Sequence, residues 1–496
     1  MCRTLLLFLL FQLAFNFLNA QNFTAKIIDR NTQNPIPFAA IQFDEKSGSI
    51  SNEEGFFTID LENKSAVNLT ISCLGYSNIT IATQKISQNN FVIRLEEAIN
   101  QLDEVYLSNR TPNPDSIIAH VNRNIKDNYQ IPLVKHSIFS RETTYATFKD
   151  VDFDLDKATH VNKTQMERAN KSLDSLEHYI TNNKSIHFAD FQGDLFVKSK
   201  DSVKLKVNKA TRLIDQNTDF SIKKIQSKTQ NLVLKYLDSS KTYKLKSGLF
   251  KIEDSMSLSS AKNKSEKHQQ NEYTISGLTE KTHERWGNSQ FYSDAVMNSI
   301  IDTNLYKYEF LDVTYQNNEL VYIINYKPRK AKAKYTGKIY VSSDNYAIIK
   351  MDYTFAKGKH GEKLNLRLLI GVKYVEDLRN GVMIFKKNEH NKYQPQYIKH
   401  TYGSYFYAHR PIKFIENSPN KNKVAFDLKL EGNIINKQEI LFTDNSEINN
   451  DEFQSLKETK NVPFQLLKKY DSGIWDSSKT LEPLEEMKQF ESSEKF

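Results

Sequence analysis

The strongest constraint on the fold comes from segment 364–374, in which apolar and polar residues alternate. Every second position is apolar: Leu364, Leu366, Leu368, Ile370, Val372 and Tyr374. Polar residues such as Arg367 and Lys373 fall between them. Because successive side chains of a strand point to opposite faces of a sheet, this pattern predicts a strand with one apolar face. Such a row cannot face water over its whole length, so we expect another part of the protein to cover it.

The same alternation recurs along the stretch 186–446. Its strand-like segments are joined by turn residues at 342–345 and 431–433. Consecutive strands joined by short turns pair antiparallel, so the stretch predicts one large antiparallel sheet. The segment YTGKIYV at 335–341, followed by YAI at 346–348, is similar to strands of the open half-barrels that carry lipoproteins or lipid. The similarity implies that the sheet could curve into a half-barrel.

Residues 1–20 have the pattern of a secretory signal peptide. Arg3 precedes an apolar stretch, and Leu18-Asn19-Ala20 suits cleavage, so we expect a mature chain that begins at Gln21. The alternative is an uncleaved anchor helix, but the stretch is shorter than the roughly 20 residues of a membrane span. We expect an exported protein with no transmembrane helix in the mature chain. Cys73 then has no disulfide partner, and we expect it to be a buried structural residue.

Residues 21–108 form a run of short strand-like segments separated by turns. A set of residues is spread along this segment: Asp29, Thr32, Pro35-Ile36-Pro37, Ala39, Gly48, Asn52, Gly55, Phe57, Gly75-Tyr76 and the exit Leu102-Asp103-Glu104-Val105. In these residues the segment resembles the carboxypeptidase regulatory-like domain. The resemblance implies a transthyretin-like β-sandwich of about seven strands, of a kind common in the envelope proteins of Gram-negative bacteria. Gly55 suits a turn that needs a positive φ before the next strand.

Residues 109–185 predict a linker helix, a strand and a polar helical insertion. Pro114 suits a first helical position, and four apolar residues then share a helical face: Ile117, Ile118, Val121 and Ile125. The helix at 114–129 and the strand at 136–145 together resemble a family of uncharacterised exported proteins that carry the same N-terminal domain. Residues 150–185 predict a solvated insertion, and residues 447–496 a polar tail with a helix and disorder.

Three structures could cover the apolar face of the predicted sheet: the helix at 114–129, a second sheet layer, or a lipid. We favour the helix, because its apolar stripe matches the row. The predicted fold is therefore mainly β, with an N-terminal transthyretin-like sandwich followed by a helix and a large antiparallel sheet that carries a helical insertion.

The sequence contains no recognisable catalytic motif. A zinc carboxypeptidase needs His-x-x-Glu, and none of the 11 histidines begins this motif or His-x-x-x-His. A Gly-x-Ser-x-Gly motif and a phosphate-binding glycine loop are also absent. The acidic pairs Glu53-Glu54 and Asp103-Glu104 are expected to be solvated residues of turns or strand ends, since a calcium site needs denser acids. We therefore expect no enzymatic activity, no metal site and no cofactor.

One basic segment lies between two predicted strands and contains Lys327, Arg329, Lys330, Lys332 and Lys334. These residues could keep a sheet edge solvated or contact the anionic headgroups of envelope lipids. Elsewhere acids and bases are interleaved, and the net charge is only +8, which argues against a nucleic-acid surface.

These features favour a non-enzymatic exported protein that binds or scaffolds an envelope protein or a lipid, in the periplasm or at the outer membrane. One alternative is a half-barrel carrier of lipids or lipoproteins, because an apolar concave face would need a ligand. A second alternative is a hydrolase that lacks a recognisable motif.

Overall fold

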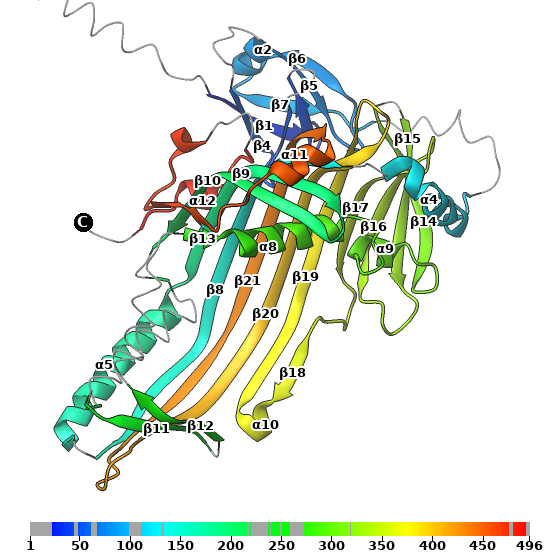
Figure 1. Cartoon of the computed structure of the whole chain (residues 1–496). Coiled ribbons are helices and arrows are strands. Elements are labelled where there is room, and N and C mark those ends of the chain that lie inside the picture. Colours follow the sequence, from blue (N-terminus) through cyan, green and yellow to red (C-terminus); the bar gives the residue numbers. More distant parts are fainter. Residues whose placement is uncertain are drawn as a thin grey trace, which may run out of the picture.

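The computed structural model describes residues 22–43, 48–60, 67–98, 111–129, 133–159, 161–215, 218–219, 237–238, 240–248, 250–257, 272–317, 319–475 and 480–492. The predicted signal peptide, its cleavage site and the exit motif at 102–105 lie outside these residues. The predicted mainly β architecture is confirmed (Figure 1). An N-terminal domain of two small sheets is followed by a helix and by one large sheet.

The N-terminal domain is a sandwich of the strands β1 (Asn22–Asp29), β2 (Ala40–Gln42), β3 (Gly48–Ile50), β4 (Phe56–Asp60), β5 (Asn68–Ser72), β6 (Ile79–Ala82) and β7 (Val92–Leu95). One sheet has the order β4-β1-β7, the other has the order β3-β2-β5-β6, and α2 (Thr83–Gln88) joins β6 to β7. Ile27, Phe57 and Ile71 are fully buried in the core between them. Gly55 has a φ of +79°, and a Cβ there would lie 2.5 Å from the carbonyl oxygen of Ile27, so only glycine fits this turn.

The large sheet is 14-stranded. Its strands are β8 (Val134–Ala158), β9 (Ser185–Ser199), β10 (Ser202–Ile214), β11 (Thr242–Ser247), β12 (Phe250–Ser257), β14 (Tyr306–Gln316), β15 (Glu319–Pro328), β16 (Tyr335–Ser342), β17 (Ile348–Phe355), β18 (Lys363–Leu366), β19 (Val372–Lys387), β20 (Tyr393–Glu416), β21 (Lys423–Glu447) and β23 (Gln465–Leu467). The main path is β14-β15-β16-β17-β19-β20-β21-β8-β9-β10-β23. Among the described strands its two ends do not pair with each other, so the sheet is open. Two further strands, β13 (Glu272–Thr274) and β22 (Asn461–Pro463), pair separately.

The helices after the sandwich are α4 (Pro114–Tyr129), α5 (Lys163–Asn182), α8 (Ile275–Asn288), α9 (Val296–Ile300), α10 (Arg367–Ile370), α11 (Asn450–Ser455) and α12 (Glu485–Lys488), with the 3-10 turn η2 (Ser472–Ile474). Helix α4 confirms the predicted helix at 114–129. Its residues Ile117, Ile118 and Val121 are buried in one cluster with sheet residues such as Ile324 and Ile339. The helix therefore covers the β15–β17 region of the sheet.

The upper part of the large sheet is covered on both faces. Ile138 of β8 packs with Trp286 of α8. Its neighbour Phe139 packs with Ile50 of the sandwich and with Leu481 of the C-terminal segment, residues 480–492. Neighbouring residues of a strand point to opposite faces, so α8 covers one face and the sandwich and C-terminal segment cover the other. The predicted polar tail is thus partly built into the core, because β23 also joins the sheet beside β10.

The predicted single strand at 364–374 is wrong. Strand β18 ends at Leu366, the chain then makes the helical turn α10, and β19 starts at Val372. Gly371 has a φ of +67°, and a Cβ there would lie 2.1 Å from the carbonyl oxygen of His409, so the turn depends on glycine. Leu368 is fully exposed as a result. Helix α4 therefore covers other strands, and the predicted apolar row does not exist.

The large sheet also starts earlier than the predicted boundary at 186. Strand β8 lies between β21 and β9, inside the stretch 109–185 that we assigned to the linker and insertion. Residues 150–156 alternate aspartates with Val151, Phe153 and Leu155, and this period of two produces a strand. Helix α5 is packed against this part of the sheet through Leu173 and Ile180, so the insertion is not a solvated arm.

Candidate functional site

Helix α8 lies across one face of the large sheet (Figure 1). Three cavities adjoin this helix. Their volumes are about 340, 320 and 470 Å³. The first and second cavities share Lys281 and Arg285 as lining residues, and the second and third share Glu284 and Arg379. The three cavities are therefore neighbours along this helix, and we call the series the α8 groove.

A row of five residues on five adjacent strands, four of them polar and one a glycine, forms the floor of the α8 groove. From β8 to β17 the row consists of Glu142, Gln438, His400, Gly381 and Tyr353, each directly opposite the next. Directly opposed residues of a sheet point to the same face. The row therefore faces α8, and all its members except Gly381 line the first or the second cavity.

Arg285 of α8 binds this row. Its side chain is buried, its Nε donates to Oε1 of Gln438 at 2.7 Å, and its Nη2 donates to Oε2 of Glu142 at 2.8 Å. Lys281 lies 3.3 Å from the same carboxylate oxygen. Burial raises the pKa of Glu142, but Arg285 and Lys281 outweigh burial and hold this pKa below its usual value. Glu142 is therefore ionised at neutral pH, and the helix is fixed on the sheet by charged hydrogen bonds.

Tyr353 and His400 form a second contact in the row. A Cβ at Gly381 would lie 2.5 Å from the ring of Tyr353, so the ring crosses the strand only because this position is glycine. The Tyr353 hydroxyl reaches Nδ1 of His400 and hydrogen-bonds to it. Burial lowers the pKa of His400 to about 4, so the imidazole is neutral at pH 7.

When Tyr353 donates to Nδ1 of His400, the ring hydrogen is on Nε2. This Nε2 is buried and forms no hydrogen bond of standard geometry among the described residues, although the backbone of Arg285 lies near the imidazole, and His400 lines the second cavity. Buried polar atoms are nearly always paired in folded proteins, so an unpaired donor that faces a cavity is available to a ligand.

The first cavity has two similar atoms. The hydroxyl of Tyr273 and Nδ1 of His187 are buried without a hydrogen-bond partner in the described part of the chain, and both residues line this cavity. Burial lowers the pKa of His187 to about 4, and it raises the pKa of Tyr273 above its ordinary value. Both groups are therefore neutral at pH 7 and can hydrogen-bond without a charge of their own.

The lining of the α8 groove is rich in positive charge. It contains seven basic and four acidic residues: Lys200, Arg212, Lys281, Arg285, Lys332, Lys334 and Arg379 against Glu142, Asp190, Glu284 and Asp294. Four of these cations are already in ion pairs, Lys200 with Asp294, Lys281 and Arg285 with Glu142, and Arg379 with Glu376. The excess of positive charge that remains favours anions.

The predicted basic segment lies at the third cavity. All five of its residues are exposed, with Lys327 in β15 and the other four in the connection to β16. Lys332 and Lys334 line the third cavity, whereas Lys327, Arg329 and Lys330 do not line any of the three. The segment therefore divides into two residues of the groove and three residues outside it, and contact with an anionic surface stays a prediction.

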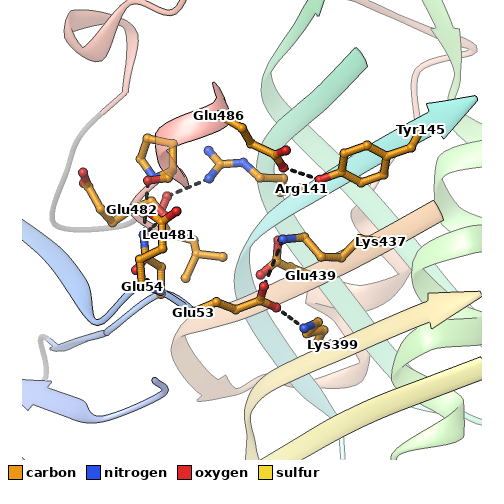
Figure 2. A network of polar contacts seen from close by, with 12 residues as sticks. Glu53, Glu54, Arg141, Tyr145, Lys399, Lys437, Glu439, Leu481, Glu482 and Glu486 are labelled. Atoms are coloured by element: carbon orange, nitrogen blue, oxygen red, sulfur yellow. Dashed lines mark hydrogen bonds and ion pairs between the residues drawn. The ribbon is translucent and has the colours of Figure 1, made fainter. Parts of the chain in front are cut away.

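The turn acids Glu53 and Glu54 belong to a polar network that joins the sandwich to the large sheet (Figure 2). Glu53 forms ion pairs with Lys399 of β20 and with Lys437 of β21, the latter at 3.5 Å. Although burial raises the pKa of Glu53, Lys437 and Lys399 lower it below its usual value. The backbone N–H of Glu485 donates to Glu54 at 3.1 Å. The expectation of solvated turn acids is therefore wrong for this pair, and the second pair, Asp103-Glu104, lies outside the described residues.

The C-terminal segment completes this junction (Figure 2). Arg141 of β8 pairs with Asp190 of β9 at 2.7 Å and donates to the carbonyl oxygen of Leu481 at 3.1 Å. Tyr145 of β8 donates a hydrogen bond to Glu486. Because a buried charge needs partners, Arg141 holds the C-terminal segment against the sheet.

Metal ligands and reactive thiols are not part of this arrangement. Within the described residues, no group of three or more His, Cys, Asp or Glu could hold a metal ion. Cys73 is half-buried against the core of the sandwich, and burial raises the pKa of its thiol to about 11, so the thiol is protonated at neutral pH. In the same part of the chain, no helix is long and apolar enough to cross a membrane.

The sandwich has the strand composition, the Gly55 turn and the buried core that the resemblance implied. A family model described as the CarboxypepD_reg-like domain matches residues 23–107. Residues 23–107 are a carboxypeptidase regulatory-like domain. This carboxypeptidase regulatory-like domain is the part that contributes Glu53 and Glu54 to the junction with the large sheet. The large sheet, with the α8 groove, lies outside the matched residues.

Solved structures resemble this chain only distantly. A domain named for outer membrane lipoprotein sorting, from Vibrio parahaemolyticus, is 7% identical, with 68% of this chain and 95% of that chain covered and a TM-score of 0.20. MucB in complex with MucA is 8% identical, covering 63% and 92%, with a TM-score of 0.15. The outer membrane protein OprG from Pseudomonas aeruginosa is 6% identical, covering 65% and 99%, with a TM-score of 0.13. No relative was found among curated proteins.

Sequence reasoning missed the residues on the floor of the α8 groove. A signal was present in the alternation: His400 and Tyr402 follow Ile398 at every second position, and Ser140 and Glu142 follow Ile138 in the same way. A polar residue in an apolar series of period two marks a place where a buried face becomes polar. His400 begins neither His-x-x-Glu nor His-x-x-x-His, so the metal-binding motifs do not single it out.

Proposed function

We propose that the protein is a non-enzymatic binding protein of the cell envelope, and that its α8 groove holds an extended anionic ligand. The signal-like N-terminus and the carboxypeptidase regulatory-like domain support export and an envelope location. The observation that carries the proposal is the series of adjoining cavities along α8, in which basic residues outnumber acidic residues and unpaired donors remain.

The shape of the groove favours an extended ligand over a single small anion. A lone phosphate would need one compact cluster of donors, whereas the cations of the groove are spread from Arg212 in the first cavity to Lys334 in the third. An acidic polymer or an acidic polypeptide segment could contact several of them at once. Nε2 of His400 and the hydroxyl of Tyr273 would then hydrogen-bond to ligand oxygens between the cations.

The alternatives expected from the sequence fit the groove less well. A lipid-carrying half-barrel needs an apolar hollow, whereas most of the residues that line these three cavities are charged or polar. A hydrolase needs a base that works near neutral pH, whereas a histidine with a pKa of about 4 is a weak base. Both considerations favour binding over transport of lipid and over catalysis.

Fluorescence anisotropy with labelled poly-L-glutamate tests the proposal. The test variant is Lys332→Gln with Lys334→Gln, which removes two cations from the third cavity. The matched control is Lys327→Gln with Lys330→Gln, which removes the same charge from the same segment outside the groove. Exposed charge pairs contribute up to ~1 kcal/mol each, so the loss of two cations should weaken binding by up to roughly 30-fold, and the control should bind like the wild type.

Two outcomes would contradict the proposal. Equal losses in both variants would show that the polymer binds to general surface charge. Absence of binding by the wild type at low salt, where attraction between charges is strongest, would show that the groove does not accept acidic polymers.

A further inference from the structure

The turn α10 displays two leucines to solvent at the end of the large sheet. Leu368 is 101% exposed and Leu369 is 80% exposed, and Leu364 of β18 is also exposed. Scattered single apolar residues are normal on a protein surface, but two adjacent leucines on one short helical turn form a small exposed apolar patch.

The backbone of α10 is held in place by hydrogen bonds to β20. The N–H of His409 donates to the carbonyl oxygen of Gly371 at 2.8 Å, and Nη1 of Arg410 donates to the carbonyl oxygen of Ile370 at 2.6 Å. Gly371 permits the close approach to β20, as described above. The leucines are therefore presented by a defined turn that is tied to the neighbouring strand.

A second apolar pair lies beside α10. The hairpin of β11 and β12 exposes Phe250 and Ile252, which are 54% and 59% accessible. Arg410 joins the two elements, because its guanidinium also donates to Ser247 of β11 and lies 5.5 Å from the centre of the Phe250 ring. Figure 1 shows α10, β11 and β12 together at the end of the large sheet that is opposite the sandwich.

Basic residues outnumber acidic residues around these apolar side chains. We define the tip as residues 244–248, 250–254, 362–374 and 409–413, which contain eight Lys or Arg and three Asp or Glu. Part of this charge is paired, because Lys251 lies 2.6 Å from Asp254 and His409 lies 2.8 Å from Asp427 of β21. Lys363 and Arg367 are exposed and precede Leu368 in the chain, and no acidic residue lies between 363 and 375. Exposed apolar side chains within a ring of basic residues match the two layers of an anionic lipid surface, acyl chains beneath negative headgroups.

We propose that the tip docks on an anionic lipid surface, with Leu368 and Leu369 inserted and the surrounding lysines and arginines among the headgroups. This role is independent of the α8 groove, which adjoins a different part of the sheet. Docking at the tip would leave the sandwich directed away from the lipid. It also differs from the lipid contact predicted for residues 327–334, because that segment carries no comparable exposed apolar pair.

Vesicle co-sedimentation of the full chain tests the docking. Vesicles of phosphatidylcholine and phosphatidylglycerol in equal parts serve as the anionic probe, and pure phosphatidylcholine vesicles serve as the neutral one. The wild type should bind the anionic vesicles more strongly, and added salt should weaken this binding. Leu368→Ser with Leu369→Ser should lower the partition coefficient about tenfold or more, because it removes most of the inserted apolar area.

Two further variants make the test specific. Lys363→Gln with Arg367→Gln should reduce binding to anionic vesicles only. Leu311→Ser alters a leucine of β14 that is 44% exposed outside the tip, and it should bind like the wild type. Circular dichroism should give the same melting curve for all variants, because the replaced side chains are exposed.

The proposal is overturned if the wild type does not bind anionic vesicles, or if the double leucine variant binds as well as the wild type. It is also overturned if the tip variants abolish self-association in sedimentation velocity while vesicle binding is absent. In that case the tip would be an interface between copies of this chain.

Discussion

The substitution Val121→Asp should detach α4 from the large sheet. Val121 is 1% exposed and packs in the same apolar cluster as Ile324 and Ile339. The variant loses the burial of a valine, which contributes about 1.5–3 kcal/mol, and it places an unpaired carboxylate in the cluster. An uncompensated buried charge costs about 3–5 kcal/mol, which is a large fraction of the stability of a typical domain.

Thermal unfolding and urea unfolding followed by tryptophan fluorescence measure this effect. Trp286 and Trp475 both pack against the large sheet, in apolar clusters other than that of α4, so the signal reports on unfolding of the sheet that α4 stabilises. A loss of this size should lower the Tm by roughly 10 °C. Ala119→Asp is the matched control, because it adds the same charge to an exposed position of the same helix and should change stability by less than about 0.5 kcal/mol.

The pH dependence of the Val121→Asp variant identifies the cause of the loss. Burial raises the pKa of the introduced carboxyl above its unfolded value of about 3.9, so near that pH the stability deficit relative to wild type should shrink to the part caused by the lost valine burial and the neutral carboxyl. The deficit should then grow as the pH rises, because the folded state must hold the charge. Equal melting temperatures for Val121→Asp and Ala119→Asp would refute the reasoning, since α4 would then not depend on its buried face.

Four further outcomes are expected. Three buried histidines have pKa values lowered by burial to about 4 from 6.5, namely His136, His187 and His400. As the pH falls, these histidines take up protons in the unfolded state before they do so in the folded state. The free energy of unfolding should therefore fall between pH 6.5 and pH 4, by about 1.4 kcal/mol per pH unit for each histidine. A urea midpoint that does not change between pH 7 and pH 5 would contradict this. Glu53→Gln should destabilise the protein by about 1–2 kcal/mol, because Lys399 and Lys437 lose their common partner, and an unchanged Tm would argue against the junction. N-terminal sequencing of envelope fractions should find Gln21 first rather than a full-length chain. Elemental analysis of purified protein should find no stoichiometric zinc, and a chelator-sensitive peptidase activity would overturn that expectation.

Much of the local structure was readable from the sequence. The turn glycine Gly55, the apolar stripe of α4 and the strand pattern of the sandwich each depend on residues close together in the chain. The limits of α4 agree with those expected because Pro114 and the spacing of Ile117, Ile118 and Val121 are local features. The alternation of Val151, Phe153 and Leu155 was also present, but the high charge of this segment obscured it.

The candidate site depends on relations that no local pattern contains. A period of two shows which residues of a strand share a face, but it does not show which strand lies beside it or what covers that face. Glu142, His400 and Gln438 come together only because β8 inserts beside β21 and pairs with it in one register. The position of α8 above them follows from the packing of Trp286 against the same sheet.

The sequence by itself determined that the chain is rich in strands, that its first domain is a carboxypeptidase regulatory-like sandwich, and that α4 has one buried face. These properties follow from side-chain periodicity and from the backbone needs of single residues. Only the tertiary structure decided that Glu53 is an interdomain ion pair, that Leu368 is exposed, and that Arg285 meets Glu142. Each of these outcomes depends on contacts between distant segments, and their free energy arises only when the whole sheet has assembled.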